Sequence, residues 1–92
     1  MKKILAQFNV ADFTEEKYDQ VVNDLEAAGQ GKPSGRLHHV VAQQATGGML
    51  VTDVWESEDA LNEFSKTLIP ILQKNGVTPA APTMLPVHNI IG

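Results

Sequence analysis

The sequence has no cysteine and a single arginine, Arg36, and these two shortages exclude several classes of function. Without cysteine there are no disulfides and no thiolate metal ligands, which fits a reducing compartment, so we expect a cytoplasmic protein. The net charge is −4, and no stripe of Lys or Arg exists to neutralise phosphates. Nucleic-acid binding is therefore not expected.

Long hydrophobic runs are also missing. The start of the chain, MKKILAQFNV, begins like a signal peptide, with Lys2 and Lys3 ahead of apolar residues. Gln7, Asn9 and Asp12 interrupt that run too early for a secretory leader. No stretch approaches the roughly 18 apolar residues of a membrane span. We expect neither a leader nor a membrane segment.

The chain of 92 residues fits one domain, covering 1–92. A domain of this size buries only about 60–65% of its unfolded surface, which leaves a thin margin of stability. Because disulfides are excluded, association with a second subunit is the expected source of further burial. We therefore expect a homodimer.

Hydrophobic periodicity predicts six secondary-structure elements. Thr14 and Ser57, each followed by two acidic residues, are typical helix N-caps. Gly47-Gly48 indicates a tight hairpin turn. Pro70 removes an amide donor inside the second helix, so we expect a kink or two pieces there. The predicted segments are strand 3–10, helix 14–28, strand 36–46, strand 49–56, helix 57–74 and strand 83–91.

This order predicts an α+β protein with the ferredoxin-like βαββαβ arrangement, a four-stranded antiparallel sheet with both helices on one face. We assign Leu5, Val51 and Trp55 to the opposite face. An apolar sheet face is not stable in water, so two such faces are expected to pack together as a dimeric α/β barrel.

The stretch GGMLVTDVWESEDALNEF, followed by a Leu-x-Pro step and the closing strand PVHNII, resembles the dimeric α/β-barrel superfamily. Within it, the chain is similar to the antibiotic-biosynthesis-monooxygenase-like proteins, over nearly its whole length in element order. The resemblance implies a substrate cavity on a sheet face of each protomer. It also implies one of several activities: cofactor-independent oxygenation of polycyclic phenols, haem degradation, or lyase or isomerase chemistry.

Haem binding is not carried over from this resemblance. The haem-degrading members use an Asn on the first strand, a Trp on the third and a His on the second helix. Asn9 and Trp55 match the first two in kind. The predicted second helix, Ser57 to Lys74, contains no His that could act as the proximal ligand.

Asp53 is the most unusual residue of the predicted sheet. The other ten acidic residues lie in predicted helices, their caps or the approaches to them, whereas Asp53 lies in the middle of a strand. Aspartate is unfavourable there and needs a partner if it is buried. Asp53 is thus predicted to be a pocket carboxylate or to orient a histidine; the alternative is an exposed charge.

His38 and His39 are adjacent in a strand, so their side chains point to opposite faces. A two-residue turn would place His38 opposite Trp55, and a three-residue turn would place His39 there. The resemblance favours His39. A His39–Asp53 pair would be a simple general base, and the alternative is a structural histidine at the sheet or the dimer interface.

The remaining candidates are predicted to surround this pair. His88, in the last strand, is expected beside Gln7 and Asn9 as a second base or proton donor; the alternative is an edge histidine. Gln7 and Asn9 are predicted to bind substrate on the face that carries Asp53 and Trp55. Trp55 either stacks on a planar substrate or fills the core.

Two further residues are assigned more ordinary places. Tyr18 is expected in the core with its hydroxyl in water. Arg36 is expected at the rim, with contact to an anionic substrate as the alternative. No Gly-rich phosphate loop, nucleophile elbow or metal-ligand spacing occurs in the sequence. Neither an organic cofactor nor a metal is therefore expected.

These residues lead to one hypothesis and two alternatives. The hypothesis is a cofactor-independent monooxygenase of small aromatic or polyketide-like molecules, in which His39, Asp53 and His88 act on protons. The first alternative is a non-catalytic dimeric module that binds ligands or serves in stress. The second is a lyase or isomerase that uses the same base without oxygen.

Overall fold

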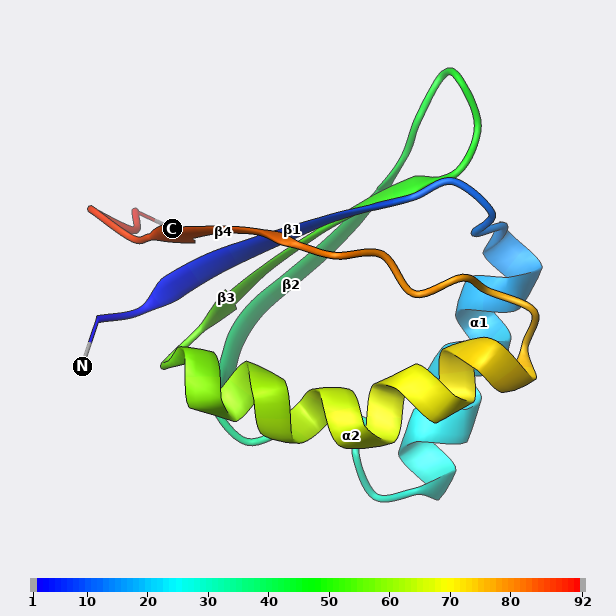
Figure 1. Cartoon of the computed structure of the whole chain (residues 1–92), viewed down its shortest axis with the longest axis horizontal. Helices are drawn as coiled ribbons and strands as arrows, with labels where there is room; N and C mark the ends of the chain where they lie inside the picture. The colour runs from blue at the N-terminus through cyan, green and yellow to red at the C-terminus, as the bar shows by residue number, and fades with distance from the viewer. Residues whose placement is uncertain (1, 92) are drawn as a thin grey trace.

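Four antiparallel strands and two helices follow one another in the predicted order in the computed structural model, which describes residues 2–91. The sheet has the order β2-β3-β1-β4, and both helices cover the same face (Figure 1). The ferredoxin-like βαββαβ prediction is confirmed. The elements are β1 (Ile4–Val10), α1 (Glu15–Ala27), β2 (Arg36–Gln43), β3 (Met49–Trp55), α2 (Glu58–Lys74) and β4 (Thr83–Pro86).

Both helices begin at the predicted caps. The Thr14 hydroxyl accepts a hydrogen bond from the Lys17 amide at 3.2 Å, and the Ser57 hydroxyl accepts one from the Ala60 amide at 3.2 Å. Each bond satisfies an amide that has no partner within its own helix. The acidic first turns then face the positive end of each helix dipole.

Of the two alternatives expected at Pro70, the division into two pieces is wrong, because α2 is one helix from Glu58 to Lys74. Because Pro70 has no amide hydrogen, the carbonyl of Lys66 has no amide partner in the helix. Both Pro70 and Lys66 are exposed. Water can hydrate that carbonyl at the surface. Within residues 2–91, neither helix combines the length and the apolar character needed to cross a bilayer.

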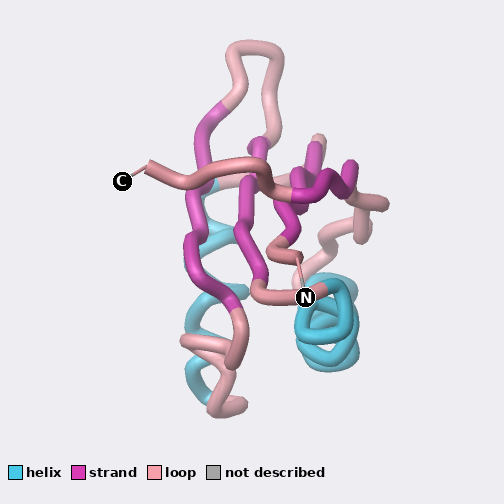
Figure 2. The backbone as a smooth tube through the Cα atoms, turned by 90° about the vertical axis from the view of Figure 1, so that its left-hand side faces the viewer, coloured by secondary structure: helices cyan, strands magenta, loops and turns pink. Residues whose placement is uncertain are grey.

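The hairpin between β2 and β3 is longer than predicted. β2 ends at Gln43, and a five-residue loop, 44–48, replaces the tight turn at Gly47-Gly48. The loop projects beyond both helices in two perpendicular views (Figures 1 and 2). Gly48 has φ of 77°, and a Cβ there would lie 2.6 Å from the Val10 carbonyl oxygen, so a side chain would not fit.

The last strand is shorter than the predicted 83–91. β4 ends at Pro86, which has no amide to continue the ladder. The Val87 amide still donates to the Lys3 carbonyl at 2.9 Å, and the chain then leaves the sheet.

The strand register corrects the assignment of faces. Ala6 lies opposite Asp53, and Phe8 lies opposite Val51. Directly opposed residues share a face, so Val51, Asp53 and Trp55 point toward the helices. The prediction that Val51 and Trp55 lie with Leu5 on the other face is wrong. Every second residue of β3, from Met49 to Trp55, is buried under the helices.

Trp55 anchors the core between the sheet and α2. It is the largest side chain with no exposed surface, and its ring lies 5.4 Å from that of Phe64, centroid to centroid. Among the described residues, the Trp55 indole nitrogen has no hydrogen-bond partner. The other buried apolar residues are Ala6, Val10, Phe13, Val21, Leu25, Met49, Val51, Leu61, Phe64, Leu72 and Val77.

Candidate functional site

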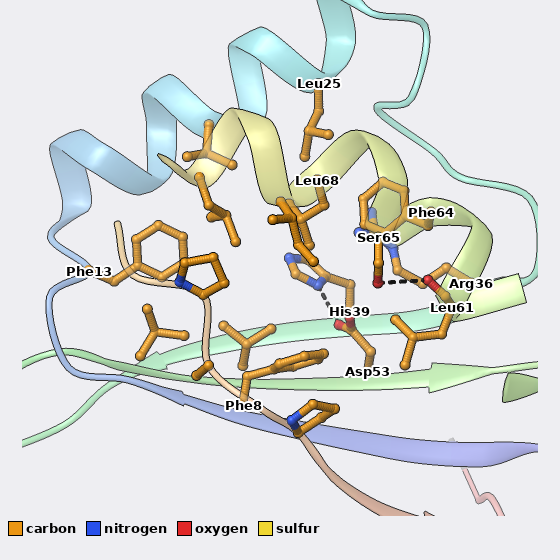
Figure 3. A pocket seen from close by; sticks show the side chains of 18 of the residues that line it. Phe8, Phe13, Leu25, Arg36, His39, Asp53, Leu61, Phe64, Ser65 and Leu68 are labelled. Atoms are coloured by element: carbon orange, nitrogen blue, oxygen red, sulfur yellow. Dashed lines mark hydrogen bonds and ion pairs between the residues drawn. The ribbon is translucent and has the colours of Figure 1, made fainter. Parts of the chain in front are cut away.

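A cavity of about 470 Å³ lies between the sheet and the two helices. This volume falls within the range of pockets that hold small molecules. Its walls are mainly apolar, and Figure 3 shows several of these side chains around one polar cluster. Exposed residues of α2 and of the segment before β4 also line it, so the cavity reaches the surface there. The labelled apolar residues are Phe8, Phe13, Leu25, Leu61, Phe64 and Leu68.

His39 and Asp53 form the polar cluster at the sheet side of this cavity. They are directly opposed on β2 and β3, and His39 Nδ1 lies 2.5 Å from Asp53 Oδ1 (Figure 3). The Asp53 side chain is 6% exposed and that of His39 is 26% exposed. Asp53 is the one buried charged residue among those described. A carboxylate removed from water is stabilised by such a donor.

In the structure His39, and not His38, faces Asp53. The strand register that places it there differs from the registers that the two-residue and three-residue turns would have given. The five-residue loop and a bulge between Arg36 and His38 place His39 opposite Asp53 and His38 opposite Val54. His38 is exposed on the other face. The pairing of His39 with Asp53 is therefore confirmed, whereas the predicted contact of either histidine with Trp55 is not.

Tyr18 is a member of the cluster that the sequence interpretation missed. It lies on α1, and its hydroxyl is 2.8 Å from His39 Nε2. The two rings are nearly parallel, with an interplanar angle of 12° and centroids 6.1 Å apart. Tyr18 packs against the core as predicted, but its hydroxyl, which was expected in water, bonds to His39, a partner that depends on how α1 crosses β2. The three side chains form a continuous chain from Asp53 through His39 to Tyr18.

Two hydrogen bonds of His39 are compatible with one tautomer of its ring. In the tautomer protonated at Nδ1, Nδ1 donates to the Asp53 carboxylate and Nε2 accepts from the Tyr18 hydroxyl. Burial raises the pKa of Tyr18 above its ordinary value of 10.0, although Arg36 acts against that shift. Tyr18 is thus a neutral phenol at neutral pH, and in this tautomer its hydroxyl donates to Nε2.

Gln7 and Asn9 lie on the sheet face away from the helices and do not line this cavity. The Gln7 amide donates to the Thr52 hydroxyl at 3.3 Å, and the Asn9 carbonyl oxygen accepts from the Gln44 amide at 2.9 Å. The prediction that they share a face with Asp53 is wrong, because the register pairs Asp53 with Ala6, on the face toward the helices, and Gln7 with Thr52.

His88 and Trp55 also fall outside the cavity wall. His88 follows the end of β4, is exposed, and lies past the Lys3 end of β1, away from Asn9. Its predicted place beside Asn9 is wrong because β4 runs antiparallel to β1, with Thr83 opposite Gln7 and Pro86 opposite Ile4, so the chain moves away from Asn9 toward His88. Trp55 is fully buried beneath the cavity and fills the core. Asn9 and Trp55, the two residues that matched haem-degrading enzymes in kind, lie on opposite faces.

The segment 77–82, which connects α2 to β4, forms one wall of the cavity and is fastened by Asp12. The Asp12 carboxylate, in the turn after β1, accepts a hydrogen bond from the Thr78 amide at 3.0 Å. This bond holds the pKa of Asp12 below its ordinary value of 3.8. Thr78, Pro79, Ala80 and Pro82 all line the cavity.

Asp12→Asn is expected to lower the free energy of unfolding at pH 7, because an amide is a weaker acceptor for the Thr78 amide. The folded protein binds the Asp12 proton less readily than the unfolded chain does. The stabilisation is therefore present at neutral pH and is lost as the pH falls below 3.8. Urea unfolding at pH 7 and about pH 3 should show a difference from wild type that shrinks at the lower pH. An equal difference in unfolding free energy at both pH values would contradict this role of Asp12. Asp19→Asn, at an exposed position, is the control.

No three His, Cys, Asp or Glu side chains between residues 2 and 91 gather in a way that could hold a metal ion. Comparison with models of protein families and with curated proteins found no match. Solved structures, however, match the chain over nearly its full length.

SnoaB from Streptomyces nogalater, described as a cofactor-independent oxygenase, superposes with a TM-score of 0.65 at 12% identity, covering 99% of this chain and 98% of that one. Rv0793 from Mycobacterium tuberculosis gives 0.61 at 17% identity, covering 98% and 97%. A candidate antibiotic biosynthesis monooxygenase from Chloroflexus aurantiacus gives 0.60 at 16% identity, covering 98% and 95%.

The chain has the antibiotic biosynthesis monooxygenase fold. The predicted resemblance to these proteins is confirmed at the level of the fold, over nearly the whole chain. At these identities the antibiotic biosynthesis monooxygenase fold says nothing about which substrate is turned over. The chemistry must be argued from the cavity itself.

Proposed function

We propose that this protein is a cofactor-independent oxygenase of small aromatic or polyketide-like phenols, with His39 as its general base. The observation that carries the proposal is the Asp53–His39–Tyr18 chain in the wall of an otherwise apolar cavity of about 470 Å³. A polar chain of this kind in an apolar wall is typical of proton transfer. SnoaB, which shares the fold, is named as an oxygenase of the same class.

In the proposed reaction the substrate loses a proton to the His39 imidazole. Tyr18 covers Nε2, so the proton passes either to the Tyr18 oxygen while the Tyr18 hydrogen moves to Nε2, or directly to Nε2 when the hydroxyl turns aside. Asp53 then faces a doubly protonated imidazole, which its negative charge stabilises at a distance of 2.5 Å.

The carbanion formed in this way reacts with oxygen. For a substrate with an acidic CH₂ between aromatic rings, the CH₂ becomes a carbonyl, one oxygen atom enters the product and the other leaves as water. The substrate supplies the electrons, so no redox cofactor is required. The apolar side chains Phe8, Phe13 and Leu68 would hold the rings and exclude water.

Oxygen uptake with 1,8-dihydroxyanthrone and its 3-carboxylate tests the proposal. Both probes are flat, contain the acidic CH₂ and give coloured quinones. We expect the protein to raise oxygen consumption and quinone formation together, above the rate without protein. Products formed only without oxygen uptake would instead indicate lyase or isomerase action. No rate above background with either probe, and no binding of either, would favour the non-catalytic alternative.

We also propose that the protein is a homodimer joined through the sheet faces away from the helices. Apolar side chains remain exposed there: Val40 is 61% exposed and Leu85 is 55% exposed. Val40 is on β2 and Leu85 is on β4, at the two edges of the sheet, so the apolar surface extends across it. Such a surface is more typical of an interface than of a monomer.

Val40→Lys is expected to convert the dimer to a monomer, because it would bury a charge in the apolar interface. Sedimentation velocity should give a mass near 20 kDa for wild type, about twice the 10.0 kDa chain, and near 10 kDa for the variant. Glu63→Lys, on the exposed side of α2, is the control that should leave the dimer intact. A wild-type protein that sediments as a monomer would refute the interface.

A further inference from the structure

Arg36 brings one positive charge to the cavity. It is the first residue of β2, is half-buried, and lies in the cavity wall beside Phe64 (Figure 3). Its Cζ is 5.8 Å from the centre of the Phe64 ring. Arg36 therefore belongs to the cavity rather than to an outer rim, which was the first expectation from the sequence.

The guanidinium of Arg36 is largely unused by the protein. Nη2 donates to the Gly31 carbonyl at 3.4 Å, which is long for a hydrogen bond. No carboxylate in the described part of the chain lies within ion-pair distance of it. Most of its five N–H groups remain able to bind an anion. A half-buried cation with no counter-charge in an apolar wall is well suited to a charged ligand.

The spacing along the sheet relates this charge to the proposed base. Arg36 lies opposite Trp55, and His39 lies opposite Asp53, two residues away on β3. Two residues of a strand span about 7 Å. The field of Arg36 also reaches the Tyr18 hydroxyl, where it opposes the effect of burial. The cation and the base thus act on one cavity from neighbouring positions.

We propose that the cavity takes aromatic acids, with the carboxylate on Arg36 and the ring extending toward His39. A planar guanidinium binds a carboxylate through two parallel hydrogen bonds, and one cation matches one negative charge. The buried Asp53 repels an anion at the other position, so the acid enters in one orientation. This inference deepens the proposed function, on which it rests for the role of His39, but carboxylate recognition itself needs no turnover.

The test compares binding of 6-hydroxy-2-naphthoic acid and its methyl ester by isothermal titration calorimetry. The pair differs in charge at one end and keeps the hydroxyl at the other. The acid should bind at least about tenfold more tightly than the ester, as expected for a hydrogen-bonded ion pair. Arg36→Gln should abolish that preference and leave the ester unchanged, and Arg36→Lys should restore part of it.

Lys32→Gln removes the same charge from an exposed site outside the cavity lining and should leave the preference intact. Equal binding of acid and ester by wild type, or a preference that survives Arg36→Gln, would overturn the inference. Binding of the ester shows that the cavity is folded, so an Arg36→Gln variant that binds neither ligand is misfolded. In that case the acid preference of Arg36→Lys decides the inference. An Arg36-dependent preference without any oxygen uptake would refute the oxygenase and leave carboxylate recognition standing.

Discussion

Replacing His39 with asparagine is expected to lower kcat for anthrone oxygenation by about 10²–10⁴-fold, the range for loss of a positioned general base. Asparagine is chosen because its amide nitrogen can donate to Asp53 much as Nδ1 does, so the buried carboxylate keeps a partner. It has no basic nitrogen to accept the substrate proton. Initial rates of oxygen uptake at saturating probe measure the effect.

His38→Asn is the matched control for that experiment. His38 is the neighbouring residue, is exposed, and points away from the cavity, so its replacement should leave kcat within about twofold of wild type. If the His39 variant retained the wild-type rate, His39 would not be the base. If both variants lost activity equally, the effect would come from the strand and not from the imidazole.

Replacing Trp55 with alanine should produce the largest loss of stability in the chain. Removal of a fully buried aromatic ring costs about 3–5 kcal/mol, and a domain of this size has only about 5–14 kcal/mol in total. Trp55 has no exposed surface and packs against Phe64. Urea unfolding followed by circular dichroism measures the change, since Trp55 is the only tryptophan and its fluorescence is lost.

Trp55→Phe should be much milder than Trp55→Ala, with a loss below about 2 kcal/mol. Phenylalanine keeps most of the apolar volume and removes an indole N–H that has no partner among the described residues, which itself opposes folding by about 1–3 kcal/mol. Ile91→Ala is the control, because Ile91 is 90% exposed. A loss as large for phenylalanine as for alanine would show that the indole nitrogen has a partner after all.

Local sequence signals predicted the elements well wherever the chemistry of one residue decides a boundary. Thr14 and Ser57 cap their helices as expected, because a hydroxyl one residue before the helix satisfies an amide regardless of the rest of the fold. The two-piece alternative predicted at Pro70 was wrong. The effect of Pro70 depends on whether the carbonyl it leaves unpaired is buried or exposed, and only the packed helix shows which.

The candidate site could be predicted only in part. Asp53 was found because a charge in the middle of a strand is unusual, and His39 was preferred to His38 because the resemblance favoured it, since the hairpin register was left open. Asp53 was wrongly placed on the face of Gln7 and Asn9, because the alternation of each strand says which of its own residues share a face but not how two strands are in register. A change of one residue in register exchanges the two faces.

The sequence alone determined the order of the elements, the absence of cysteine chemistry and the unusual position of Asp53, a charge in the middle of a strand. These follow from composition, periodicity and the polarity of single positions. The tertiary structure decided that His39 pairs with Asp53, that the pair faces the helices, that Tyr18 completes it and that Arg36 enters the same cavity. Each of those contacts joins segments far apart in the chain, and their positions depend on strand register and on how α1 crosses the sheet, which no local pattern encodes.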